Sequence, residues 1–202
     1  GAVGHWEVAN TKWGAPIENT SSEKANSYLK SYRKVLGAHT DQAIGNYVFL
    51  WGQKQEKTPT WYGMYLGSGE ETEAIDVMHY IWNGQWPENR TPTVSPIRLN
   101  NYTADKNVIL SQSKQYTATL DVQDFDNDLI TYEWELRPES AQDEVGGDHE
   151  EVPEVIAGLI EDSTAEEIIL TAPQKTGAYR LFVTVFDGNN HAGHANFPFY
   201  VE

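Results

Sequence analysis

The chain contains no cysteine, and basic side chains are scarce relative to acidic ones. Without cysteine it can form neither a disulfide nor a thiolate zinc site, and it has no thiol nucleophile. With 202 residues it can instead be held together by burial and hydrogen bonding. There is no run of about 18 apolar residues, so the sequence predicts no membrane span. The residues from Gly1 onward do not have the pattern of a signal peptide, which leaves the compartment open.

Charge is distributed unevenly along the sequence. Residues 1–93 carry 10 acidic and 8 basic side chains, whereas residues 94–202 carry 20 acidic and 6 basic ones. This asymmetry indicates two parts with different surfaces. Because an acidic surface repels phosphate backbones, we expect no nucleic-acid partner, and hydrated cations suit the surface better.

Two helices and one buried strand are predicted in the first ninety residues. The segment 20–23 (TSSE) has the pattern of a capping box, and apolar residues then recur at helical spacing from Ser22 to Leu36. A second helix is predicted to follow the acidic segment 68–71 and to end at Asn83-Gly84. Between them, Tyr47–Trp51 is a continuous apolar run. A run of this kind is typical of a strand buried on both faces of a parallel sheet.

A proline-containing linker is predicted at residues 91–96, and beyond it the hydrophobic period changes from helical to alternating. The predicted strands are residues 97–99, 107–110, 115–123, 129–136, 166–171, 178–187 and 194–201. Short strands separated by turns favour an immunoglobulin-like β-sandwich over residues 97–202, with Trp134 as its core aromatic. The acidic stretch 140–154 is predicted to be a loop.

Aromatic and polar side chains gather around the predicted strand at residues 47–51. The candidate binding residues are Trp6, Trp51, Gln53, Lys54, Trp61 and Tyr62. An aromatic face with hydrogen-bonding neighbours suits a sugar ring, which has an apolar C–H face and a rim of hydroxyl groups. The alternative is that Trp51 and Trp61 simply fill a core, as most aromatic side chains in apolar runs do.

Glycoside hydrolysis would require a pair of carboxylates. Glu7, Glu18 and Glu56 are the glutamates of the first part that lie outside the predicted helices. Glu7 is the candidate catalytic group, because an apolar neighbour could raise its pKa. The sequence identifies no carboxylate partner for it, so a structural hydrogen-bonding role is the alternative. Neither a nucleophile elbow nor a complete phosphate-binding glycine loop is present.

Three aspartates, Asp124, Asp126 and Asp128, alternate with other residues in the manner of a calcium-binding loop. The glycine and the distal glutamate of an EF-hand are missing, so that motif does not match. The alternative is a polar turn in which aspartates accept hydrogen bonds from backbone amides. His191 and His194 are a second possible metal pair, although residues three apart on a strand point to opposite faces.

Several motifs in residues 4–90 resemble a known enzyme family. HWEV, WGAPIE, FLWGQK followed by TPTWYG, and TEAIDVMHYIWNGQWP are similar to the final portion of the (β/α)8 barrel of bacterial family 2-like glycoside hydrolases. These enzymes are the relatives of β-galactosidase, β-glucuronidase and β-mannosidase. The resemblance implies an α/β barrel-derived fragment over residues 1–90, in which Trp51 forms the floor of a sugar subsite. It also implies that the nucleophile lies before Gly1 and that the general acid is absent, so the isolated chain is expected to be inactive.

In the second part, DFDNDLITYEW and YRLFVTVFDG resemble PKD- or cadherin-like modules attached to enzymes of surface polysaccharides. Together the resemblances imply the C-terminal region of a secreted bacterial carbohydrate-active enzyme, extracellular or periplasmic, with carbohydrate as its partner. Two alternatives stay open. One is a stand-alone carbohydrate-binding module with an aromatic platform, and the other is a structural or adhesion module stiffened by calcium at Asp124, Asp126 and Asp128. The exposed apolar surface of a barrel fragment would also favour a homodimer.

Overall fold

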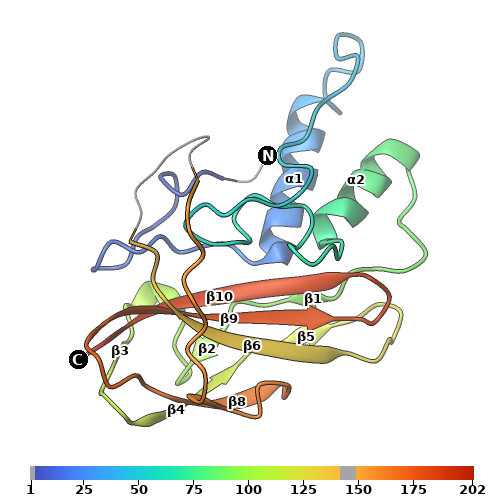
Figure 1. Cartoon of the computed structure of the whole chain (residues 1–202). Coiled ribbons are helices and arrows are strands. Elements are labelled where there is room, and N and C mark those ends of the chain that lie inside the picture. Colours follow the sequence, from blue (N-terminus) through green and yellow to red (C-terminus); the bar gives the residue numbers. More distant parts are fainter. Residues whose placement is uncertain (1–2, 142–148) are drawn as a thin grey trace.

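A β-sandwich with two helices on one of its faces makes up the computed structural model, which describes residues 3–141 and 149–202 (Figure 1). In spatial order, the first sheet contains β3 (Ile109–Leu110), β10 (Ala192–Val201), β9 (Gly177–Phe186) and β6 (Thr131–Pro138). The second sheet contains β2 (Arg98–Leu99), β4 (Gln115–Thr119), β8 (Glu167–Thr171) and β7 (Ile160–Glu161). The remaining elements are the antiparallel pair β1 (Thr93–Val94) and β5 (Val122–Gln123), the 3-10 helix η1 (Ala104–Lys106), and the helices α1 (Ser21–Val35) and α2 (Glu73–Asn83).

The alternation of apolar and polar residues in the second part matches the strands of the sandwich, whose apolar side chains form its core. Each of the seven predicted segments contains at least one strand. Trp134 on β6 is buried in the core, and its indole Nε1 donates a hydrogen bond to the Ala165 carbonyl at 2.9 Å. Residues 140–141 and 149–154 of the predicted acidic loop have no helix or strand, and its centre, residues 142–148, lies outside the described residues.

Both faces of β10 are covered. Phe197, Phe199 and Val201 point into the sandwich core, whereas His194 and Asn196, on the opposite face of the pleat, are buried under the helices. The helices and loops before residue 93 therefore form a layer over the first sheet (Figure 1). Neither helix is long and apolar enough to cross a membrane, and the described residues contain no other candidate.

The α/β barrel fragment predicted for residues 1–90 is wrong. Among the described residues of this part there are two helices but no β-strand, only isolated β-bridges. The predicted buried strand Tyr47–Trp51 is irregular and turns at residues 49–50, with Tyr47 104% exposed and Trp51 55% exposed. A barrel strand is buried only when neighbouring strands and helices flank it. Here α1 packs on the sandwich and on α2, and Val48 is the residue of this run that packs partly against the helices, while Tyr47, Phe49 and Trp51 are exposed.

The capping box predicted at residues 20–23 is present and starts α1 at Ser21. Thr20 Oγ1 accepts a hydrogen bond from the Glu23 amide, and the Glu23 carboxylate accepts one from the Thr20 amide. The same turn is fixed to the sandwich, because Ser21 Oγ accepts a hydrogen bond from the His194 amide and Ser22 Oγ accepts one from the Val94 amide. The N-terminus of α1 is therefore fixed to β10 and β1.

A buried polar network, which we call the polar seam, joins the N-terminal layer to the first sheet. It comprises Glu18, Lys24, Thr58, Thr60, Arg180, His194 and Asn196. At its centre, the Glu18 carboxylate accepts hydrogen bonds from Lys24 Nζ, from the hydroxyls of Thr58 (2.6 Å) and Thr60 (2.9 Å), and from Asn196 Nδ2 (2.6 Å). Arg180 continues the network to Asn196 Oδ1 and to the Pro16 carbonyl.

The pKa values of the buried seam residues are lowered, for different reasons. Burial alone would raise the pKa of Glu18, but the Lys24 ammonium, His194 and the hydrogen bonds outweigh it and lower that pKa to about 2. Burial, followed by the charge of Lys24, lowers the pKa of His194 to about 3 despite the opposing effect of Glu18. Burial also lowers the pKa of Lys24, against the opposing charge and hydrogen bond of Glu18. At neutral pH the seam therefore contains an ionised Glu18, held by the Lys24 side chain, beside a neutral imidazole.

Replacing Glu18 by alanine should lower the free energy of unfolding by about 3–5 kcal/mol, because Lys24 would remain buried without its counter-charge. Urea denaturation of the wild type and the variant measures this loss. As a control, the double variant Glu18→Leu with Lys24→Met should recover the part of the loss that comes from the unpaired ammonium. The donors Thr58, Thr60 and Asn196 still lose their acceptor, so the recovery should be partial. A loss below about 1 kcal/mol for Glu18→Ala would show that the seam is not structurally important.

Stability should also fall as the pH is lowered from 6.5 towards 3. The folded-state pKa of His194 is lowered from 6.5 to about 3, so the unfolded chain binds the proton first across this window. The free energy of unfolding should drop by up to about 1.4 kcal/mol per pH unit from this one group. The test compares the slope of the unfolding free energy against pH in the wild type and in His194→Gln, between pH 6.5 and 5. In this range the comparison reports on His194, because Glu18 titrates at lower pH. Equal slopes would contradict the prediction.

Candidate functional site

Three segments of the N-terminal layer converge around one exposed indole. We call the group the Trp6 cluster, and it comprises His5, Trp6, Lys54, Glu56, Trp61 and Tyr62. The His5 ring centroid lies 4.9 Å from that of Trp6 and 6.0 Å from that of Trp61, both in edge-on geometry. His5 Nε2 lies 3.5 Å from one carboxylate oxygen of Glu56, and Lys54 Nζ lies 2.5 Å from the other. The cluster thus combines an aromatic surface with groups of both charges.

A tight turn positions Trp6. The Glu7 amide donates to the Gly4 carbonyl at 2.9 Å, and the Gly4 amide donates to the Glu7 carboxylate at 2.9 Å. A Cβ atom at Gly4 would lie 2.6 Å from the Trp6 ring, so the indole packs directly on the Gly4 backbone. Trp6 is nevertheless 63% exposed. Its surface away from Gly4 is therefore open to a ligand.

The groups beneath Trp6 are largely withdrawn from solvent. Glu56 is buried, and its carboxylate lies between His5 and Lys54. Burial, and after it the charge of Glu56, raises the pKa of Tyr62 to about 12, so this phenol keeps its proton at neutral pH. The partly exposed polar groups of the cluster are therefore the Lys54 ammonium and the His5 imidazole, supported by the buried Glu56 carboxylate and the neutral phenol of Tyr62.

The structure brings together some of the residues singled out from the sequence and separates others. Trp6, Lys54, Trp61 and Tyr62 all lie in the Trp6 cluster, but Trp61 is only 1% exposed and Tyr62 is also buried. Their rings cannot stack on a ligand and instead support the site. Trp61 Nε1 donates to the Val3 carbonyl at 2.9 Å, which connects the cluster to the start of the described chain.

Gln53 and Glu7 have local structural roles. Gln53 Nε2 donates to the Pro59 carbonyl at 2.8 Å and so closes the loop that carries Lys54 and Glu56. Glu7, the candidate catalytic group, is the acceptor of the turn under Trp6. Sequence reasoning missed His5 and the central position of Glu56. The only local signal was that His5 adjoins Trp6 and that Glu56 lies two residues after Lys54.

Trp51 lies on a different surface. Its ring centroid is 5.4 Å from that of Tyr65 and 6.4 Å from that of Trp82 on α2. Both Trp51 and Trp82 are more than half exposed. We call Trp51, Tyr65 and Trp82 the aromatic face. The single platform expected from Trp51 and Trp61 is thus divided between an apolar surface and a charged one.

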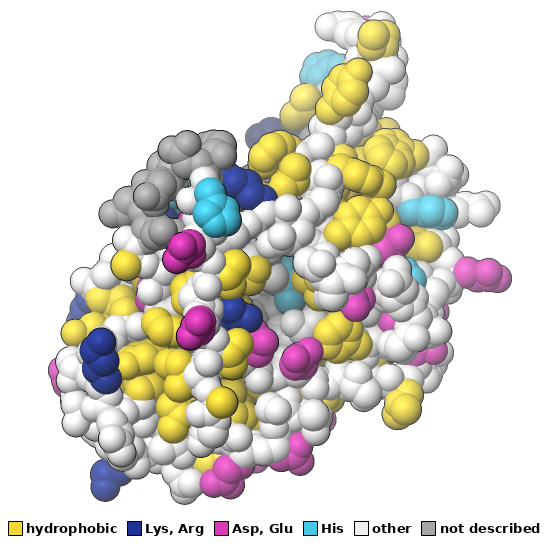
Figure 2. Space-filling model, viewed as in Figure 1, with side chains coloured by type: hydrophobic (Ala, Val, Ile, Leu, Met, Phe, Trp, Pro, Cys, Tyr) yellow, Lys and Arg dark blue, Asp and Glu magenta, His cyan; other side chains and the backbone are white. Residues whose placement is uncertain are grey.

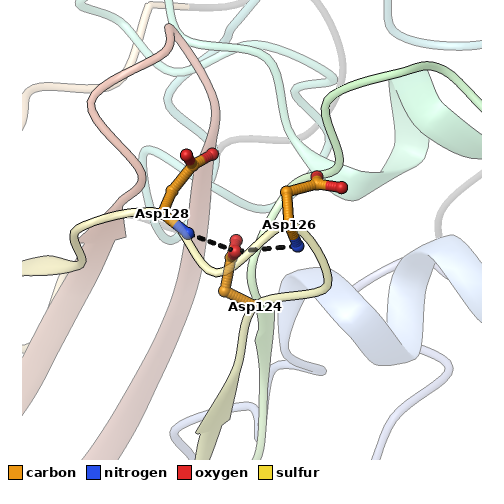
Figure 3. A group of neighbouring side chains, drawn as sticks. All are labelled: Asp124, Asp126 and Asp128. Atoms are coloured by element: carbon orange, nitrogen blue, oxygen red, sulfur yellow. Dashed lines mark hydrogen bonds between the residues drawn. The ribbon is translucent and has the colours of Figure 1, made fainter.

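The three aspartates of the predicted metal loop lie close together in the turn between β5 and β6 (Figure 3). One oxygen atom from each of Asp124, Asp126 and Asp128 lies within 4.8 Å of the others. Asp124 Oδ1 accepts hydrogen bonds from the amides of Asp126 (3.0 Å) and Asp128 (2.9 Å), as Figure 3 shows. We call these residues the Asp triad.

The Asp triad could bind a metal ion. Asp124 Oδ2 is buried and has no hydrogen-bond partner among the described residues, so it is available as a ligand. Asp126 accepts a hydrogen bond from the Arg90 amide at 2.6 Å, and Asp128 accepts one from Asn189 Nδ2 at 2.9 Å. Three carboxylates at this separation repel one another, and a bound cation would relieve that repulsion.

The two histidines considered as a metal pair have different surroundings. His194 is buried in the polar seam. The Nδ1 atom of His191 lies 3.2 Å from the buried Asp187 carboxylate, and its Nε2 atom lies 3.7 Å from Glu71. His191 thus bridges the sandwich to the segment that precedes α2.

No protein-family model matches the chain, and no curated protein matches it. Among solved structures, a nucleoside hydrolase-related hypothetical protein from Saccharophagus degradans, described as associated with carbohydrate metabolism, matches 56% of this chain at 16% identity and a TM-score of 0.35. The match covers 26% of that protein. The PmoD soluble domain from a Methylocystis species matches 58% of this chain and 95% of its own, at 11% identity and a TM-score of 0.31. Likenesses this distant carry no functional argument.

Proposed function

We propose that this chain binds carbohydrate at the Trp6 cluster, as a region of a secreted carbohydrate-active protein. The observation that carries the proposal is the position of Trp6. Its indole is 63% exposed and adjoins His5, which contacts the Glu56–Lys54 pair. The sequence resemblance of residues 4–90 to family 2-like glycoside hydrolases points to the same ligand class and to a location outside the cytoplasm, although these residues do not form the barrel of those enzymes.

The chemistry of the cluster matches the two surfaces of a sugar ring. The apolar C–H face of a pyranose can stack on the exposed indole of Trp6, as aromatic side chains provide apolar area at little entropic cost. The hydroxyl rim requires polar groups near that indole. His5 beside Trp6 and the partly exposed Lys54 supply them, and the buried Glu56 holds both in place. Since Glu56 is already buried and paired with Lys54, binding should cost these side chains little further conformational entropy.

We assign binding, and not hydrolysis, to the described residues. Glu56 is paired with Lys54, and Glu7 holds the turn beneath Trp6. Hydrolysis by a carboxylate pair would need one group free to donate a proton and another free to act as nucleophile or base. Any hydrolytic step would thus depend on carboxylates other than these two.

Replacing Trp6 by alanine should weaken oligosaccharide binding at least tenfold, which corresponds to about 1.4 kcal/mol or more. The reason is that the exposed indole supplies the stacking surface, whereas its removal leaves the buried groups in place. Isothermal titration calorimetry against a panel of neutral and acidic oligosaccharides identifies a ligand and measures the loss.

The matched control is Trp82→Ala, which removes another indole that is more than half exposed but lies on the aromatic face. This variant should bind like the wild type. Equal losses in the two variants would contradict a site at Trp6, and so would the absence of binding across the whole panel.

A second proposed function is calcium binding at the Asp triad, which would stiffen the sandwich. The specific observation in favour is the buried, unsatisfied Oδ2 atom of Asp124 beside two further carboxylates. Calcium prefers oxygen ligands and tolerates irregular geometry, as loops with several carboxylates provide.

With an affinity between about 0.1 and 1 mM, 10 mM calcium should stabilise the protein by about 1.4–2.7 kcal/mol. Differential scanning calorimetry with and without chelator would detect the shift in Tm. Asp128→Asn should abolish the shift, because it removes one anionic ligand from the triad. Asp105→Asn, at an exposed aspartate on η1, should keep it. A shift that persists in Asp128→Asn would rule out the triad as the site.

A further inference from the structure

The second half of α1 carries an apolar stripe that the described part of the chain leaves uncovered. The buried residues of the helix all lie at or before Tyr28, where α1 packs against α2 and the sheet. Tyr32, Val35 and Leu36 continue the same helical spacing beyond that point. Val35 is more than half exposed. Figure 1 shows this end of α1 and the following loop projecting away from the sandwich.

A groove of about 240 Å³ follows this stripe. Its walls come from α1, from the segment 46–48 and from α2, and the apolar lining includes Tyr32, Leu36, Tyr47, Val48, Met78 and Ile81. We call it the α1 groove. Tyr47 at its edge is fully exposed. Hydrophobic side chains gather on this upper part of the molecule in Figure 2. A groove with this lining fits an apolar side chain from another surface.

The stripe is bordered by positive charge, although the protein as a whole carries a net charge of −16. Arg33 and Lys34 are exposed in the last turn of α1. By helical spacing Arg33, three residues before Leu36, and Lys34, three residues after Ser31, lie beyond the two edges of the stripe. Lys30 is exposed one turn earlier. An occupant with carboxylates beside an apolar side chain therefore complements the groove.

The sandwich itself carries such a surface in the turn Phe125–Leu129. Leu129 is 84% exposed, which makes it the most exposed large apolar side chain among the described sandwich residues. Phe125 is about half exposed, and Asp126 and Asp128 lie between the two. This turn belongs to the strongly acidic part of the chain. It therefore combines an exposed apolar side chain with neighbouring carboxylates, the two features that the α1 groove requires.

We propose that the α1 groove binds the Phe125–Leu129 turn of a second copy of this chain. Leu129 enters the groove, and Asp126 and Asp128 pair with Arg33 and Lys34 at its edges. Pairing two grooves would bring like positive charges together, and pairing two turns would bring carboxylates together, so the groove-to-turn contact is electrostatically favoured. Because the two surfaces differ, each copy has one of each, and the contact leads to a ring or an open chain of copies.

Sedimentation velocity from micromolar to millimolar concentration tests the contact, with chelator present so that no cation occupies the Asp triad. The wild type should form species that grow with concentration. Leu129→Ser removes the turn side, and the double variant Val35→Ser with Tyr47→Ser removes the groove side. All three side chains are largely exposed, so the fold should persist, as circular dichroism would confirm. Each variant alone should be monomeric, with self-association weakened at least tenfold.

The decisive sample is an equimolar mixture of the two variants. Leu129→Ser still has an intact α1 groove, and the double variant still has an intact turn. The mixture should therefore form a one-to-one complex and nothing larger. As a control, Tyr102→Ser, at an exposed side chain next to β2, should assemble like the wild type. A monomeric wild type at millimolar concentration would overturn the proposal. So would undiminished assembly of Leu129→Ser, which would point to groove pairing with groove, or a mixture that stays monomeric.

Discussion

The buried carboxylate of Glu18 is the interaction on which the arrangement of this molecule depends. It accepts hydrogen bonds from α1, from the loop at residues 58–60 and from β10, so one group fixes the helix and the loop against the first sheet. A buried charge is tolerated only when its partners satisfy it. Any displacement of α1 or of the loop would leave Lys24 or Glu18 unpaired. The cost of separating these charges thus keeps the helical layer in register with the sandwich.

The hydrogen bonds of Glu18 also set the geometry of the Trp6 cluster. Thr58 and Thr60 bind Glu18 from the loop that carries Lys54 and Glu56 at one end and leads into Trp61 at the other. Glu150 of the sandwich part accepts two hydrogen bonds from the Lys57 amide and so holds the loop from its other side. The cluster therefore rests on rigid supports, which is what a binding site with little reorganisation requires.

Local sequence patterns predicted the sandwich and the start of α1, because alternation and capping depend on neighbouring residues. The polar seam could not be predicted, since Glu18 and Asn196 are 178 residues apart and carry no pairing signal. The prediction of a buried strand at residues 47–51 failed for a different reason. The composition of this run indicated burial but could not say what would cover it, and in the described structure Tyr47 is fully exposed. Trp6, Lys54 and Tyr62 were identified by residue type, whereas the role of Glu56 depended on three-dimensional contacts.

The two exposed aromatic surfaces differ in their polar neighbours, and this difference separates their roles. Trp6 adjoins His5, which lies beside the Glu56–Lys54 pair, so a ligand there finds hydrogen-bonding groups at the edge of an apolar ring. Trp51 contacts other aromatic rings, those of Tyr65 and Trp82. A sugar on the latter surface would lose water from its hydroxyls, which costs free energy for each hydroxyl left unsatisfied. An apolar protein surface has no hydroxyl groups to desolvate, so its binding does not carry this cost. The proposed saccharide is therefore better matched by Trp6, and the aromatic face is better matched by another polypeptide.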